Sequence, residues 1–82
     1  MLKVVPIKID EIYVPTGTRK ELDDSKVEAA IESLMEEEEV APIQVRKGKG
    51  RYVLVKGLHR VEAAKAVGED TIGGFIVAAR KH

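Results

Sequence analysis

The sequence predicts a single small α+β domain over residues 1–82, with a mixed sheet and two main helices. Three observations predict this fold class. Short stretches of alternating apolar and polar residues occur near the start, the middle and the end of the chain. Two stretches with apolar residues at helical spacing separate them. Turns that contain glycine or proline divide the stretches, and we find no internal repeat and no linker.

The first part of the chain is expected to be extended. Residues 2–9 alternate and are rich in β-branched side chains, and Pro6 favours an edge strand. The residues on one face of this strand are Val5, Ile7 and Ile9. Residues 12–14 predict a second short extended piece that ends at Pro15, and residues 16–19 predict a loop.

The first main helix has three adjacent candidates for its N-cap, which are Asp23, Asp24 and Ser25. Ser25 also forms a capping box with Glu28. The apolar residues at helical spacing are Val27, Ala30, Ile31 and Leu34. Glutamates 36–39 oppose the helix dipole at the C-terminal end, so we expect the helix to fray there and the block to be a solvated surface.

Residues 41–46 and 52–55 alternate on either side of a glycine-rich turn and predict a β-hairpin. The basic residues at this turn are Lys47, Lys49 and Arg51. They are compatible with contacts to a nucleic-acid backbone and equally with a solvated turn, and no aromatic residues interleave to stack bases.

The second main helix is predicted over residues 59–67, with Gly68 ending it as a left-handed cap. Small and branched residues on it, Val61, Ala63, Ala64 and Val67, predict core packing. The final strand is predicted over residues 71–77, and the Gly73-Gly74 pair in it predicts a bulge or bend.

Composition excludes several classes of function. The 14 basic and 14 acidic residues give a formal net charge of zero, so strong electrostatic binding of nucleic acid by the whole molecule is not expected. The chain has no cysteine, which removes disulfides and thiol catalysis. No apolar run approaches the length of a membrane span, and no signal-peptide pattern is present. We therefore expect a soluble cytoplasmic protein with no membrane partner.

The stretch Gly57-Leu58-His59-Arg60 is the strongest functional signal, because it joins a strand to a helix start. Free N–H groups, the helix dipole and the Arg60 guanidinium would favour an anion there, and hence the phosphates of a nucleotide. The alternative is a strand-to-helix corner with two solvated polar residues. Lys26 lies in the first turn of the other helix, and the two helix starts could grip one polyphosphate if they face the same cleft.

Metal binding and nucleophilic catalysis have no support in the spacing. His59 is the sole internal histidine, so a metal site would depend on carboxylates around one imidazole. Nothing in the sequence places Ser33 beside His59 as a nucleophile and base. We assign no catalytic residue and no metal ligand.

From Leu22 to Val77 the chain resembles the superfamily that unites sulfiredoxin with the N-terminal domain of ParB partition proteins. The segments that carry the resemblance are Leu22 to Val27, Pro42 to Val45, Gly57 to Arg60, Ala63-Ala64, Gly68 to Ile72, and Arg19 to Asp23, which is similar to a ParB lead-in. The resemblance implies a small α/β domain whose two helix starts border a nucleoside triphosphate pocket. It implies binding of ATP or CTP, with or without Mg²⁺.

The resemblance also implies roles for individual residues. The nucleotide-binding positions it implies are Lys26, Ser33, Gly57, Leu58, His59 and Arg60, with Arg19 as an additional phosphate contact. Ala29 stands where sulfiredoxins have a hydroxyl residue. Leu58 stands in the place of the sulfiredoxin catalytic cysteine. The repair of cysteine sulfinic acid proceeds through attack and a thiosulfinate, and leucine can do neither, so sulfiredoxin activity is excluded.

Three hypotheses follow. The first is a nucleotide-binding module with the phosphates at the start of the second helix. The second is an enzyme, namely a slow NTPase, a phosphotransferase or a nuclease. The third is an adaptor without catalysis that contacts DNA or a protein. ParB domains carry a Gly-Glu-Arg-Arg-like box of which only Gly57 and Arg60 are matched, and the 82 residues end before the ParB helix-turn-helix domain. We therefore do not expect a complete partition protein.

Overall fold

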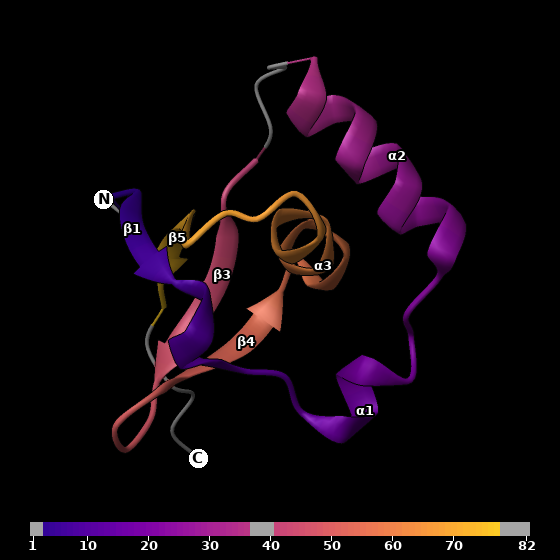
Figure 1. Ribbon diagram of the computed structural model, residues 1–82. Helices are drawn as coiled ribbons and strands as arrows, with labels where there is room; N and C mark the ends of the chain where they lie inside the picture. Colours follow the sequence, from indigo (N-terminus) through magenta and orange to yellow (C-terminus); the bar gives the residue numbers. More distant parts are fainter. Residues whose placement is uncertain (1–2, 37–40, 78–82) are drawn as a thin grey trace.

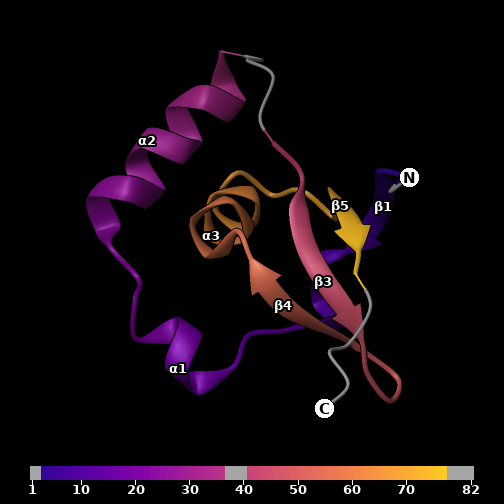
Figure 2. The same ribbon diagram turned by 180° about the vertical axis from the view of Figure 1, so that it is seen from behind.

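The computed structural model describes residues 3–36 and 41–77, and its five strands form one mixed sheet in the order β1-β5-β3-β4-β2 (Figures 1 and 2). The strands are β1 (Val5–Lys8), β2 (Ile12–Tyr13), β3 (Ile43–Lys47), β4 (Tyr52–Lys56) and β5 (Thr71–Ile76). The helices are α1 (Thr16–Arg19), α2 (Asp24–Met35) and α3 (Leu58–Ala66), with a 3-10 turn over Ile9–Glu11. The predicted α+β class with a mixed sheet and two main helices is confirmed.

The central strand β3 pairs antiparallel with β4 and parallel with β5. The outer strand β1 pairs antiparallel with β5, and the short β2 pairs parallel with β4. The helix α3 connects β4 to β5 and contacts the sheet, while α2 packs on the other side of α3. Both views show α3 between the sheet and α2 (Figures 1 and 2). The edge position predicted for the strand that contains Pro6 is confirmed.

The core lies between the sheet and α3. Its largest fully buried side chains are Ile7, Ile43, Val45 and Val61. Burial of one such side chain stabilises the fold by about 1.5–3 kcal/mol. Leu58, at the first position of α3, is only 6% exposed and belongs to the same cluster. The start of α3 is therefore fixed to the end of β4 by apolar packing.

The helix α2 is less deeply packed than α3. Its predicted apolar face, Val27, Ala30, Ile31 and Leu34, is half-buried, and none of its residues is fully buried. Asp23 is the N-cap, and its carboxylate accepts a hydrogen bond of 2.9 Å from the Ser25 N–H. The helix ends at Met35, and residues 37–39 of the predicted acidic block lie outside the described residues.

The predicted loop over residues 16–19 is wrong, because these residues form the short helix α1. The Arg19 N–H donates to the Pro15 C=O at 2.9 Å, and the Lys20 N–H donates to the Thr16 C=O at 3.1 Å. Thr and Gly are weak helix formers, so their composition favours a loop. Pro15 has a φ of −58°, which suits the entry to a helix.

The bulge predicted at Gly73-Gly74 is also wrong. Both glycines pair in regular register with β1, Gly73 with Pro6 and Gly74 with Val5. The register shift of the sheet lies in β3, between Gln44 and Val45. Gly74 instead allows the side chains of Ile7 and Ile43 to approach the backbone of β5 closely. A Cβ at this position would lie 2.7 Å from Ile7 Cδ1 and 2.9 Å from Ile43 Cγ1.

The end of α3 follows the prediction. Gly68 has a φ of +84°, and the Glu69 N–H donates to the Ala64 C=O at 2.9 Å, as in a left-handed helix cap. Val67 is 38% exposed and is not part of the core, although the sequence predicts core packing for it. No helix in the described part of the chain combines the length and apolar character needed to cross a membrane.

Candidate functional site

The turn from β4 into α3 is shaped by Gly57. This residue is the N-cap of α3 and has a left-handed conformation with a φ of +111°. A Cβ on it would lie 2.5 Å from Ile43 Cγ2, so the side-chain-free backbone packs directly against the core. Because Ile43 is fully buried, its contact with Gly57 fixes the position of the turn relative to the core.

The first turn of α3 presents backbone donors. The first helical hydrogen bond joins the Val61 N–H to the Gly57 C=O at 3.1 Å, and no side chain in the described part of the chain caps the helix. The N–H groups of Leu58, His59 and Arg60 therefore have no partner within the helix. These groups and the helix dipole make the start of α3 electropositive.

The starts of α2 and α3 are joined by one hydrogen bond. The backbone N–H of Asp23 donates to Nε2 of His59 at 3.0 Å. Since a backbone N–H can only donate, Nε2 carries no proton in this arrangement, and Nδ1 is the imidazole nitrogen that is left to donate. His59, in the first turn of α3, is thus bonded to Asp23, the N-cap of α2. Asp23 precedes Lys26 by three residues.

The two helix starts border one open hollow of about 480 Å³. We call it the cationic hollow, and its lining residues are Lys26, Ala29, Ala30, Ser33, Lys56, Gly57, His59 and Arg60. Within residues 3–36 and 41–77, no carboxylate belongs to this lining. The ion pair that the structure describes joins Lys65 to Glu62 at 3.7 Å, and none of the three cations of the hollow is paired within residues 3–36 and 41–77. The hollow is therefore a region of unbalanced positive charge.

The structure thus brings five of the residues predicted from sequence to one place, namely Lys26, Ser33, Gly57, His59 and Arg60. Leu58 contributes differently. Its side chain is buried in the core, and the residue is absent from the lining of the cationic hollow, although it lines a smaller hollow beside it. Arg19 is exposed on α1 and is absent from the lining of the cationic hollow.

Lys56 is a member of the hollow that the sequence does not reveal. It is the last residue of β4, and its position in an alternating strand gives no reason to separate it from other surface lysines. The one available signal is its place directly before Gly57. The basic hairpin turn lies at the other end of β4 and contributes nothing to the hollow, so its contact with nucleic acid stays a prediction.

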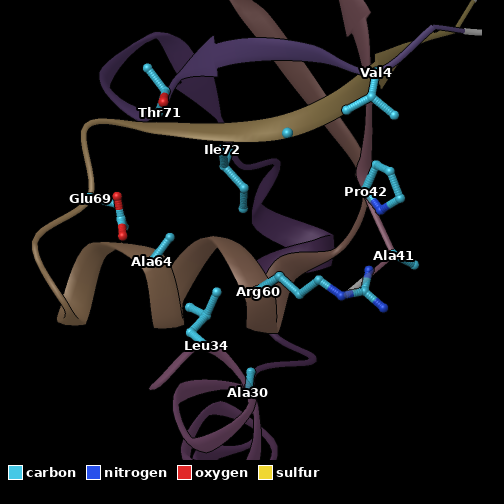
Figure 3. A pocket seen from close by; sticks show the side chains of 11 residues that line it. Val4, Ala30, Leu34, Ala41, Pro42, Arg60, Ala64, Glu69, Thr71 and Ile72 are labelled. Atoms are coloured by element: carbon cyan, nitrogen blue, oxygen red, sulfur yellow. The ribbon is translucent and has the colours of Figure 1, made fainter. Parts of the chain in front are cut away.

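Arg60 also lines a second hollow, of about 300 Å³, on its other side. The lining of this apolar hollow is Val4, Ala30, Leu34, Ala41, Pro42, Arg60, Ala64, Glu69, Thr71, Ile72 and Gly73. Figure 3 shows the Arg60 side chain leaving α3 and running toward Ala41 and Pro42, with Leu34 and Ala30 of α2 below it. Arg60 therefore forms the wall between a cationic and an apolar compartment.

The hydrogen bond between His59 and Asp23 predicts a small, selective change in stability. We expect His59→Ala to lower the free energy of unfolding by about 1 kcal/mol, because the Asp23 N–H loses its acceptor. His59→Gln keeps an acceptor oxygen and should lose less. Urea unfolding followed by circular dichroism measures both variants, and equal losses would show that the bond contributes nothing.

The sequence and the fold are similar to those of known proteins. The sequence profile of the ParB N-terminal domain matches residues 1–82. No curated protein sequence matches significantly.

Three solved structures illustrate the similarity. Sulfiredoxin from Arabidopsis thaliana shares 27% identity and a TM-score of 0.81, with 94% of this chain and 86% of that chain covered. ParB from Caulobacter crescentus, in complex with CTP-γ-S, shares 24% identity and a TM-score of 0.75, with 98% and 46% covered. A free serine kinase variant in complex with ADP shares 25% identity and a TM-score of 0.78, with 90% and 30% covered. The chain thus spans most of the sulfiredoxin but less than half of the other two proteins.

Proposed function

The chain belongs to the ParB N-terminal domain family, and from this premise we propose that it binds a nucleoside triphosphate, with the phosphates at the start of α3. The observation that carries the proposal is that Lys26 of α2 and Arg60 of α3 line one hollow with Gly57 between β4 and α3. The two helix starts that the sequence singles out therefore face the same space.

Charge supports a polyanionic ligand. Three cationic side chains line the hollow, no carboxylate of the described residues is among the lining residues, and the first N–H groups of α3 belong to the same turn. Phosphate groups are bound in this way at helix starts, through N–H donors, the dipole and charged side chains. The volume of about 480 Å³ lies within the range of small-molecule sites.

In this proposal the nucleoside lies along α2, and the same lining supports this. Ser33 offers a hydroxyl and Lys26 an ammonium group, while Ala29 and Ala30 leave a shallow apolar surface between them. Similar folds have been solved with CTP-γ-S, AMP and ADP, which supports ATP or CTP as the ligand. Mg²⁺ that accompanies the nucleotide would be held by phosphate oxygens rather than by this lining, because the lining supplies cations and neutral groups.

Sulfiredoxin chemistry does not belong to the proposal. That reaction needs a thiol at the position of Leu58, and this chain has a buried leucine there and no cysteine elsewhere. The proposed activity is binding, and turnover of the nucleotide by an NTPase or phosphotransferase step is not required by the site.

Calorimetric titration with ATP, CTP and GTP tests the proposal. We expect saturable binding of at least one of them by protein that circular dichroism shows to be folded. Lys26→Gln should weaken that binding about tenfold, because one charge-assisted contact is lost. Lys20→Gln removes the same charge outside the hollow and should leave the affinity within twofold. Absence of binding by all three nucleotides at millimolar concentration would disprove the proposal.

A further inference from the structure

Lys56 stands at the border of two compartments. Besides the cationic hollow, it lines a smaller hollow of about 210 Å³, which we call the side hollow. The side hollow is lined by Thr18, Glu21, Val55, Lys56, Gly57, Leu58 and His59. The residues common to both hollows are Lys56, Gly57 and His59, so the two spaces meet at the start of α3.

The order of groups along the cationic hollow defines a direction. The residues of α2 that line it, Lys26 and Ser33 among them, are absent from the side hollow. A nucleotide that lies along α2 therefore directs its phosphates away from Ser33, past the first turn of α3 and toward Lys56. The first phosphate meets the α3 turn, and the last phosphate is the one that reaches Lys56.

A negative charge in the side hollow limits how far the phosphates can extend beyond Lys56. Glu21 lines the side hollow and is absent from the cationic hollow. Its carboxylate repels a phosphate that enters the side hollow, whereas the Lys56 ammonium attracts a phosphate at the border. Lys56 is exposed and forms no ion pair with any other described residue, so its charge is available to a ligand.

On these grounds we propose that Lys56 contacts the terminal phosphate and makes the site prefer nucleoside triphosphates to monophosphates. This inference rests on the proposed nucleotide binding. It assigns the residue that distinguishes nucleotides by the number of their phosphates. The α3 turn and Arg60 serve every nucleotide, while Lys56 adds affinity only when the phosphate chain is long enough to reach the border.

Titration of AMP, ADP and ATP into wild type and Lys56→Gln, without Mg²⁺ and at physiological salt, tests the inference. We expect wild type to bind ATP at least about tenfold more tightly than AMP. Lys56→Gln should weaken ATP binding about tenfold and leave AMP binding within twofold. Lys49→Gln, which removes the same charge at the far end of β4, is the control for long-range attraction.

The outcomes are distinguishable. Failure of wild type to bind these three nucleotides and also CTP and GTP would overturn the proposed function itself. Binding that Lys56→Gln weakens equally for AMP and ATP would place Lys56 at the first phosphate and overturn the inference alone. If Lys56→Gln loses no more ATP affinity than Lys49→Gln, Lys56 acts only by long-range attraction. That result would also overturn the inference.

Discussion

Gly57→Ala should lower the free energy of unfolding by about 3 kcal/mol or more. Two costs add in this variant. A φ of +111° is unfavourable for alanine by about 1–2 kcal/mol. The new methyl group would also lie 2.5 Å from Ile43 Cγ2 and 2.9 Å from Ile43 Cβ, and overpacking of this kind costs about 1–3 kcal/mol. Ile43 is fully buried.

Gly50→Ala is the matched control for the first of these costs. Gly50 has a φ of +68°, and a Cβ on it would meet no heavy atom within 4 Å. It should therefore lose only the conformational part, about 1–2 kcal/mol. Urea midpoints of the two variants and wild type measure the difference. Equal midpoints for Gly57→Ala and Gly50→Ala would contradict the close packing of the turn against Ile43.

Arg60→Ala should weaken the binding of ATP or CTP by about 30-fold to 100-fold, whichever nucleotide binds. Arg60 is the cation at the start of α3, and a charged hydrogen bond contributes about 1.5–3 kcal/mol. Arg60→Lys keeps the charge but loses the planar pair of donors, so we expect a loss of about tenfold. Isothermal titration calorimetry measures both affinities.

The control for Arg60 must separate binding from packing. Arg60 is half-buried and lines the apolar hollow as well, so its aliphatic stem contributes to stability. Thr71→Ala changes the wall of the apolar hollow without touching the cationic hollow and should bind nucleotide like wild type. An unchanged nucleotide affinity in folded Arg60→Ala would show that the guanidinium does not contact the nucleotide.

Local pattern was sufficient for most of the elements. Alternation of apolar and polar residues predicts strands, because one face of a strand is buried, as Ile43 and Val45 of β3 show. Glycine at the end of α3 predicts its left-handed cap, since this conformation depends on a single residue. The N-cap of α2 is one of the three candidates, and the structure shows that Asp23 holds that position.

Two wrong predictions have identifiable causes: one segment forms a helix against its residue propensities, and one glycine pair has a role that depends on side chains distant in the sequence. The helix α1 forms from residues that favour a loop, because Pro15 and Thr16 accept its backbone hydrogen bonds. The Gly73-Gly74 pair looks like a bulge in isolation. Its reason is visible only when Ile7 and Ile43 are packed beside Gly74.

The amino-acid sequence alone determines that a glycine, a histidine and an arginine stand at a helix start after a strand, and that a lysine stands at the start of another helix. These are local properties of the chain. Only the tertiary structure decided that the two helix starts share one hollow, because the bond from the Asp23 N–H to His59 spans 36 residues. The tertiary structure also decided that Lys56 lines the hollow. The fold brings the end of β4 and the start of α2 to the same hollow, and no periodicity in the sequence predicts that they meet.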